Sequence, residues 1–309
     1  MTGSPTMAPT PVNGTDGRPQ PERPRRRVPM ALVTWAFVAL ILLIVIALLL
    51  LKVTRGTTVA ISPPVAPASS AVVRATTTIP NTVFDAVGVP DPAAPGPVAL
   101  VGQPPLTIAG HPAVVYVGGE FCPYCAAERW ALVAALGRFG SFSRLGATAS
   151  SSTEIFPSTA TFSFDGSAYH SRYLTMTAVE EFGPAPASTA PAGYPRLHDL
   201  TPLEASLVRR YDTQPFVAGS GTIPFVDVGN RYVISGAGVG FSPGVLQGTS
   251  MAQIATDLSD PTSPVTQSIA GAANVLSAAI CQLTGNRPGA VCSSPGVRAG
   301  AHRLGVPLT

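Results

Sequence analysis

The sequence has few of the residues that build metal and hydrolase sites. Of 309 residues, four are cysteine and four are histidine. The cysteine pairs enclose two and ten residues, with more than 150 residues between the pairs, and such spacings suit no common zinc site. The histidines share no ligand spacing either: His111, His170, His198 and His302. There is no Gly-x-Ser-x-Gly elbow to indicate a hydrolase, and we expect no bound metal.

Charge is also scarce and is unevenly placed. Charged residues make up 11% of the chain, the formal net charge is +3, and nearly all the basic residues are arginine. The densest basic cluster comprises Arg18, Arg23, Arg25, Arg26 and Arg27. A nucleic-acid patch is one interpretation, but an apolar run follows at once, so membrane topology explains the cluster better. We expect residues 1–29 to be a disordered, basic, cytoplasmic tail and expect no nucleic-acid partner.

Residues 30–51 are 22 consecutive uncharged and mostly apolar residues. As a helix they would extend about 33 Å, which is enough to cross a bilayer. Their apolar core is longer than that of a signal peptide, and no small-x-small cleavage site closes it tightly. We therefore expect an uncleaved transmembrane helix in a single-pass protein of the cell membrane. The arginines before it predict a cytoplasmic N-terminus and an extracytoplasmic C-terminal domain.

The rest of the chain divides by composition into three parts. Residues 52–97 are rich in proline, alanine, serine and threonine, which favours an extended linker. The position of the boundary between this linker and the domain is not sharply defined, because Val83 and Phe84 are candidates to pack on the domain. Strand-like and helical patterns occupy residues 98–292, and residues 293–309 are expected to be a flexible tail.

The domain is organised around Cys122-Pro123-Tyr124-Cys125. The apolar run 113–117 and two glycines precede the motif, and apolar residues at helical spacing follow it. We expect a buried strand, a tight turn and a helix that begins at the cysteines. Pro123 suits the first helical turn, because its missing N–H would have had no partner there.

This geometry would place Cys122 at a helix N-terminus. Free N–H groups and the helix dipole favour an anion there, and a thiolate is the nucleophile of disulfide exchange. Cys125, one turn later, is placed to resolve a mixed disulfide, so the pair itself would be the redox group without any other cofactor. A structural disulfide or half of a zinc site is the alternative.

Cys-Pro-Tyr-Cys between a strand and a helix resembles the thioredoxin-like superfamily. A second match is Thr222-Ile223-Pro224, followed by a strand, a turn and a strand. In that superfamily a cis-proline precedes the strand that faces the cysteines, so the resemblance implies that Pro224 is cis and lies against Cys122. A trans proline at the start of an edge strand is the alternative. The resemblance assigns substrate binding to Pro123, Tyr124, Ile223 and Pro224.

The segment between Cys125 and Pro224 is longer than in a minimal thioredoxin, and it mixes strand-like and helical stretches. We expect an α/β, thioredoxin-like fold with an insertion between the Cys-x-x-Cys helix and the cis-proline strand, preceded by one transmembrane helix. Residues 98–292 also resemble an uncharacterised thioredoxin-like family that is described only as a domain of unknown function. Tyr116 replaces the buried aspartate of thioredoxin. Glu120, the nearest carboxylate, either takes over its role or faces solvent, and we expect solvent.

Cys281 and Cys292 lie near the end of the last long helical segment and just beyond it. Outside the cytoplasm this pair is expected to form a structural disulfide. A second redox relay that feeds Cys125 is the alternative.

Together these patterns predict a membrane-anchored, extracytoplasmic thiol–disulfide oxidoreductase that acts on exported proteins. The compartment favours an oxidase or isomerase over a reductase, because a reductase would need electrons from across the membrane. A redox partner in the membrane is one expected partner. The alternative function is a thioredoxin-fold scaffold or binding module whose cysteines form structural bridges.

Overall fold

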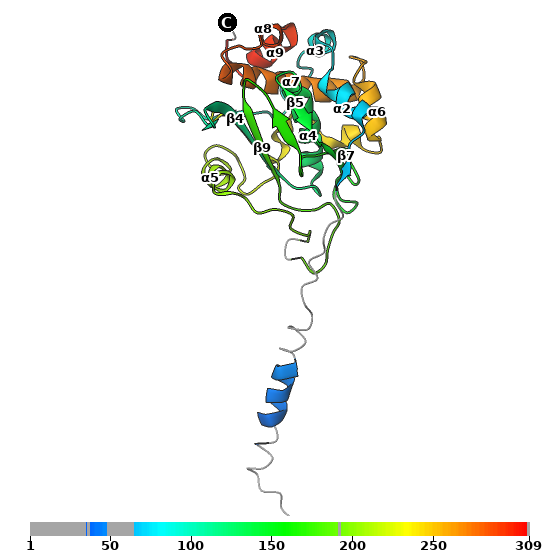
Figure 1. Ribbon diagram of the computed structural model, residues 1–309, viewed down its shortest axis with the longest axis vertical. Coiled ribbons are helices and arrows are strands. Elements are labelled where there is room, and N and C mark those ends of the chain that lie inside the picture. The colour runs from blue at the N-terminus through cyan, green and yellow to red at the C-terminus, as the bar shows by residue number, and fades with distance from the viewer. Residues whose placement is uncertain (1–34, 36–37, 48–64, 191–192, 308–309) are drawn as a thin grey trace, which may run out of the picture. The chain divides into compact units, whose positions relative to one another are not determined.

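The computed structural model describes Trp35 and residues 38–47, 65–190 and 193–307. The chain divides into two compact units, Met1–Thr58 and Val59–Thr309, which are described separately. In the first unit, residues 38–47 form a helix, shown in blue in Figure 1. The predicted cytoplasmic tail, residues 1–29, lies outside the described residues.

The prediction of a transmembrane helix over residues 30–51 needs correction. Within the described ranges, no helix is both long enough and apolar enough to span a bilayer. A span needs about 20 consecutive apolar residues in one helix. The helical residues 38–47 rise only about 15 Å. Apart from Trp35, the remaining residues of 30–51 lie outside the described part of the chain.

The second unit is built on a mixed six-stranded sheet, which agrees with the predicted α/β class. Strand β4 is central: it pairs in parallel with β9 and antiparallel with β10, as Figure 1 shows for β4 and β9. Strands β10 and β11 form an antiparallel hairpin, and β2 and β3 complete the sheet. The strands are β2 (Val98–Ala99), β3 (Thr107–Ile108), β4 (His111–Gly118), β9 (Thr175–Glu180), β10 (Phe225–Val228) and β11 (Tyr232–Ser235).

Both faces of β4 are covered, which explains its continuous apolar sequence. Because side chains alternate along a strand, Val114 and Tyr116 pack into the larger core. That core includes residues of α4 (Pro123–Leu136) and α7 (Pro264–Leu283). Val115 and Val117 pack on the other face in a smaller cluster with residues of α5 (Pro202–Tyr211).

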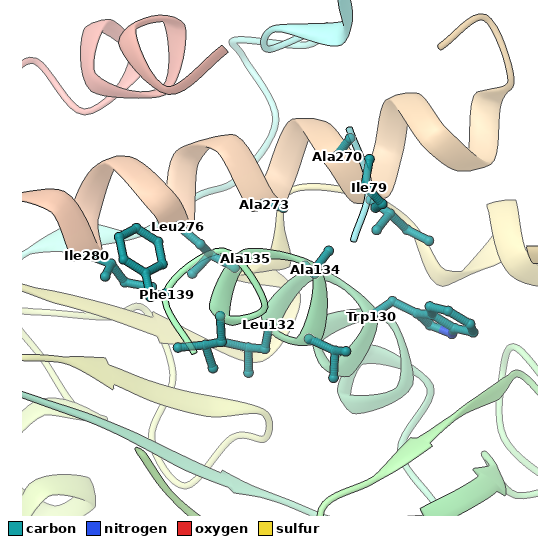
Figure 2. Close-up of a cluster of buried hydrophobic side chains, with 14 of the residues drawn as sticks. Ile79, Trp130, Leu132, Ala134, Ala135, Phe139, Ala270, Ala273, Leu276 and Ile280 are labelled. Carbon is teal, nitrogen blue, oxygen red and sulfur yellow. The ribbon is translucent and has the colours of Figure 1, made fainter. Parts of the chain in front are cut away.

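Helix α4 is buried on nearly every side. All of its residues except Tyr124 are buried, and α7 lies across it. Figure 2 shows small side chains at this crossing, with Ala134 and Ala135 of α4 near Ala270 and Ala273 of α7. Small residues allow two helices to approach closely, so the crossing holds α4 firmly at the end of β4. The helix that begins at Cys122 is therefore a rigid element.

Strands β5 to β8, between α4 and β9, take part in two small antiparallel sheets. One has the order β1-β6-β7 and the other pairs β5 with β8. Strand β1 comes from the predicted linker, whereas β5 to β9 and α5 lie between the Cys-x-x-Cys helix and the Ile223-Pro224 strand, where an insertion is predicted. Their bounds are β1 (Ala66–Pro67), β5 (Ser141–Ser143), β6 (Gly146–Ala149), β7 (Ala160–Ser163) and β8 (Ala168–His170).

The predicted linker, residues 52–97, is largely part of the folded unit. Residues 52–64 lie outside the described part, but α2 (Ser70–Thr77) and α3 (Asn81–Val87) are helices. They bury Val72, Val83 and Phe84 in the larger core. The composition predicts a spacer because proline and serine are frequent, yet Pro80 directly precedes α3 as its N-cap, where it breaks no helical hydrogen bond.

The predicted flexible tail, residues 293–309, is also folded as far as residue 307. Helix α9 (Pro295–Arg303) packs on α7, and Val297 is fully buried. Gly300 permits this contact, because a Cβ there would lie 2.4 Å from the carbonyl oxygen of Asn274. The short helix α8 (Gly289–Cys292) lies between α7 and α9. The 3₁₀ turns η1 (Gly236–Val239) and η2 (Pro243–Leu246) and helix α6 (Met251–Asp257) precede α7.

The disulfide predicted between Cys281 and Cys292 is present and links the end of α7 to α8. The two Cα atoms are 5.7 Å apart, within the usual range for a disulfide.

Candidate active site at the start of helix α4

Strand β4, the turn after it and helix α4 bring Cys122 and Cys125 together as the sequence predicts. Cys122 is the N-cap residue of α4, and Pro123 is the first helical residue. The Cys122 sulphur accepts a hydrogen bond from the Cys125 backbone N–H at 3.3 Å. Both cysteines are free, with Cys122 6% exposed and Cys125 fully buried. Only Cys122 is thus within reach of a second molecule.

The surroundings lower the pKa of the Cys122 thiol and raise that of the Cys125 thiol. The pKa of Cys122 lies below its ordinary value, chiefly because the Cys125 thiol donates a hydrogen bond to the Cys122 sulphur. The backbone N–H groups of Cys125 and Tyr124 and the charge of Arg129 act in the same direction, against the effect of burial. Burial, followed by the interaction with Cys122, raises the pKa of Cys125 well above its ordinary value. Cys122 is therefore the thiol that ionises first.

The predicted proline loop lies against the Cys122 sulphur. The Ile223–Pro224 peptide bond is cis, which confirms that prediction. The Ile223 carbonyl oxygen is 3.6 Å from the Cys122 sulphur, within the distance for a hydrogen bond from the thiol. Pro224 is buried, and its own carbonyl accepts the backbone N–H of Gly236 at 2.9 Å. Segments 101 residues apart in the chain thus meet at one sulphur atom.

Five ring side chains around the cysteines form what we call the aromatic wall: Phe121, Tyr124, Phe156, Phe182 and Tyr194. Tyr194 stacks on Phe121 with 4.0 Å between ring centroids, and Phe182 meets Phe121 edge to face. On the other side Tyr124 meets Phe156 edge to face. Of the residues assigned to substrate binding, Tyr124 is partly exposed in this wall, whereas Pro123 is buried.

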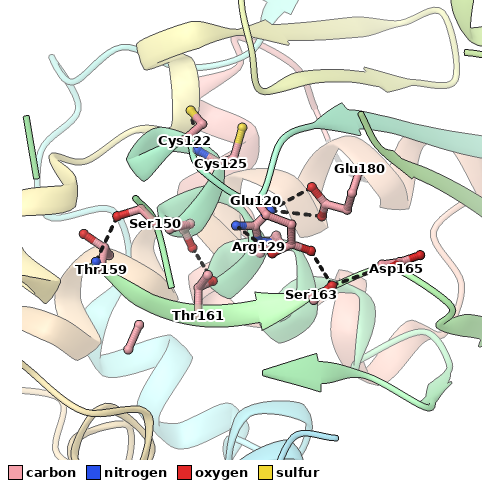
Figure 3. A network of polar contacts seen from close by, with 12 residues as sticks. Glu120, Cys122, Cys125, Arg129, Ser150, Thr159, Thr161, Ser163, Asp165 and Glu180 are labelled. Carbon is pink, nitrogen blue, oxygen red and sulfur yellow. Dashed lines mark hydrogen bonds and ion pairs between the residues drawn. The ribbon is translucent and has the colours of Figure 1, made fainter. Parts of the chain in front are cut away.

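A buried group of charges lies one turn behind Cys125, as Figure 3 shows. The Arg129 guanidinium contacts both carboxylate oxygens of Glu180, at 3.0 and 2.9 Å, and donates to the Tyr116 hydroxyl at 3.2 Å. Glu120 lies 4.0 Å from the same guanidinium and accepts a short hydrogen bond from the Ser163 hydroxyl. The expectation that Glu120 faces solvent is therefore wrong, because its side chain is fully buried between Arg129 and Ser163.

One comparison with known protein families matches part of this folded unit. A family described as "Domain of unknown function (DUF929)" matches residues 98–282, which is more than half of the chain. The chain belongs to the DUF929 family. No curated protein and no solved structure matches it. The matched DUF929 region runs from β2 almost to the end of α7 and contains Cys122, Cys125 and Pro224, whereas Cys292 lies outside it.

Sequence reasoning missed Arg129 and Glu180 in this DUF929 domain. Burial raises the pKa of Glu180, the neighbouring Glu120 raises it further, and Arg129 opposes both. Arg129 also lowers the pKa of both cysteines, whereas Glu180 raises that of Cys125. One signal was visible in the sequence: Glu128 and Arg129 are charged residues inside an otherwise apolar helix.

Glu128 is a third missed residue. Its side chain is fully buried, and neither carboxylate oxygen has a hydrogen-bond partner among the residues that the structure describes. Desolvation raises its pKa to about 8. Glu128 therefore carries a proton at neutral pH, three residues after Cys125.

The rest of the DUF929 domain offers two further observations about ligands. Across the residues described here, no three His, Cys, Asp or Glu side chains gather closely enough to hold a metal ion.

A cavity of about 520 Å³ opens beside Tyr124, between one side of α7 and residues 89–97. Its lining is mostly apolar and includes Ile234, Phe241 and Ala272.

Proposed function

We propose that this DUF929 domain is a thiol–disulfide oxidoreductase with a thioredoxin-like fold. One observation carries the proposal: a slightly exposed cysteine caps a helix, accepts the N–H of a second, buried cysteine and faces the Ile223 carbonyl. A helix N-terminus and a hydrogen bond to sulphur both favour the thiolate, which is the reactive form in disulfide exchange.

The order of the elements supports the thioredoxin-like assignment. Strand β4 leads through α4 to the parallel strand β9, and the antiparallel hairpin of β10 and β11 follows. Helix α7 then covers the same face of the sheet as α4. This βαβ unit followed by a ββα unit is the arrangement that the Cys-Pro-Tyr-Cys resemblance implies.

In the proposed reaction the Cys122 thiolate attacks one sulphur of a substrate disulfide. A bond forms between Cys122 and that sulphur, while the other substrate sulphur leaves as a thiolate. Cys125 then gives up its proton and attacks the Cys122 sulphur, which releases the second substrate sulphur. The substrate disulfide gains two electrons and two protons, and the Cys122–Cys125 pair becomes a disulfide. In the opposite direction the oxidised pair accepts attack by a substrate thiolate.

The proposed substrates are exported proteins in an oxidising compartment, where the domain forms or rearranges disulfides. The Cys281–Cys292 bridge supports this setting, because disulfides persist outside the cytoplasm and are rare inside it. Its position at the end of α7, with α8 held against that helix, favours a structural role.

The proposal is tested with Cys125→Ser and Cys122→Ser. Without Cys125 the mixed disulfide cannot be resolved, so C125S should accumulate protein adducts that a reducing gel releases. C122S, the matched control, should accumulate none. If C125S captures no protein in cells that export disulfide-containing proteins, Cys122 is not the nucleophile.

The reduction potential of the Cys122–Cys125 pair separates the proposed functions. Proteins that form or rearrange disulfides have potentials of about −120 to −180 mV, whereas thioredoxin, a reductant, has about −270 mV. We expect a value in the first range for the purified protein in graded thiol buffers. A pair that stays oxidised in all of them would favour the structural scaffold instead.

A further inference from the structure

One buried carboxylate closes the loop that connects α5 to β10. Asp212 follows the last residue of α5 and is 2% exposed. Its Oδ2 atom accepts the Thr222 backbone N–H at 2.8 Å, and its Oδ1 atom accepts the Ser235 hydroxyl at 2.6 Å. The Thr222 hydroxyl also donates to Oδ1 at 3.3 Å and contacts the Ser235 hydroxyl. Asp212 thus connects the end of α5 to the loop before β10 and to the last residue of β11.

These hydrogen bonds fix the residue that touches Cys122. A buried carboxylate loses its hydration and requires donors in return, and hydrogen bonds to a charged acceptor are the stronger kind. Ile223 follows Thr222 directly in the chain. While the Thr222 N–H is bound, the Ile223 carbonyl cannot move far from its place 3.6 Å from the Cys122 sulphur.

We propose that Asp212 is a positioning residue of the redox site, which acts through Thr222 to hold the Ile223 carbonyl against the Cys122 sulphur. This inference rests on the proposed function of Cys122. The carbonyl oxygen carries a partial negative charge, so at this distance it accepts the thiol proton and opposes the thiolate. Asp212 therefore keeps Cys122 less ionised than the helix N-terminus alone would make it.

The charged groups that act on the two cysteines lie elsewhere and stay unchanged in the test. They are Arg129 on α4, which acts on both cysteines, and Glu180 on β9, which acts on Cys125. Burial raises the pKa of the nearby Tyr116 hydroxyl on β4 well above its ordinary value, so that group stays uncharged. Asp212→Asn removes the charge of Asp212 but keeps the loop closed, so a shift that Asp212→Ala shows and Asp212→Asn lacks must pass through the loop of residues 212–224.

The test measures how fast iodoacetamide alkylates Cys122 at different pH values in the reduced, full-length protein, with the Cys122 peptide quantified by mass. Asp212→Ala frees the loop, so the Cys122 thiol loses its acceptor. The midpoint of the rate profile should then move down by about half a pH unit, which corresponds to the free energy of one modest hydrogen bond. Asp212→Asn can still accept the Thr222 N–H, so its midpoint should stay close to that of the wild type.

Asp260→Ala is the matched control, because Asp260 accepts the Thr262 N–H and hydroxyl in a similar way in the loop before α7. If D212A does not fold, Ser235→Ala removes only the Ser235 hydroxyl, with its bond to Asp212 and its contact with the Thr222 hydroxyl, and should move the midpoint in the same direction by less. A folded D212A or S235A with the wild-type midpoint overturns the proposal, as does an equal shift in D260A. A wild-type Cys122 that reacts at no pH overturns the proposed function instead.

Discussion

At the scale of single residues, the carboxyl group of Glu128 is a costly feature of the fold. It lies in α4, fully buried, with no hydrogen-bond partner in the described part of the chain. A buried carboxylate without a partner cannot keep its charge, and its pKa rises to about 8. The folded protein thus holds a proton that the unfolded chain releases near its ordinary pKa of 4.5.

Replacing Glu128 by glutamine should make stability less dependent on pH. When folding raises the pKa of an acid, the free energy of unfolding is highest at pH values below the pKa in the unfolded chain. It falls as the pH rises from that value toward the pKa in the folded protein. The wild type should therefore lose stability between about pH 4.5 and about pH 8, by up to a few kcal/mol. Glu128→Gln should make that slope shallower in urea titrations, while Asp227, whose pKa burial raises to about 7, keeps part of it. Glu154→Gln, a partly exposed control, should keep it, and a wild-type slope in E128Q would contradict the burial argument.

At the scale of elements, the packing of α9 on α7 depends on one glycine. A Cβ at Gly300 would lie 2.4 Å from the Asn274 carbonyl oxygen and 3.0 Å from the Val275 Cα, both of which belong to the α7 backbone. Backbone atoms cannot rotate aside as a side chain can, so α9 would have to move away from α7. The adjacent helix α3 also contacts both α7 and α9, which makes this junction a three-helix contact.

Gly300→Ala should therefore lower the free energy of unfolding by about 1–3 kcal/mol, the usual cost of overpacking. The matched control is Gly289→Ala at the start of α8, because no atom lies within 4 Å of a Cβ there. Urea midpoints and melting temperatures of the two variants provide the comparison. Equal stability of G300A and G289A would show that α9 is not held by this contact.

The same scale shows what the sequence could predict. Strand β4 and helix α4 follow from an apolar run, two glycines and a first-turn proline, all of which are local. The Arg129–Glu180 pair could not be predicted, because it joins residues 51 apart. The parallel register of β4 and β9 places Glu180 beside the end of β4, near α4. Asp212 was missed for the same reason, since its partners lie 10 and 23 residues away. Helices α2 and α3 were missed because a composition rich in proline and serine outweighed the apolar residues that they bury.

At the scale of the whole folded unit, the DUF929 match and the folding unit differ in extent. The match covers residues 98–282, yet α2, α3, α8 and α9 outside it contribute to the same core. Helix α7 contacts α3, α8 and α9, so segments from both sides of the matched region converge on it. The region that defines the family is therefore smaller than the unit that folds.

A chain that begins at residue 98 should consequently be far less stable than one that begins at residue 65. The shorter chain loses the buried side chains of Val72, Val83 and Phe84 and exposes their apolar neighbours. At about 1.5–3 kcal/mol for each side chain, the loss is about 5 kcal/mol or more, which is comparable with the stability of a typical domain. Urea unfolding of the two chains measures the difference. Equal midpoints would mean that α2 and α3 contact the core but do not contribute to its stability.

The aromatic wall around Cys122 has a consequence for how this protein can change over evolutionary time. Phe156, Phe182 and Tyr194 come from segments outside the β4–α4 unit that carries both cysteines. Substitutions there can alter the rim of the site while the Cys122–Cys125 hydrogen bond and the Arg129 pair stay intact. In the proposed oxidoreductase, part of the surface that recognises substrates would thus be encoded apart from the reactive cysteines, so new substrates could be acquired without a change in the chemistry.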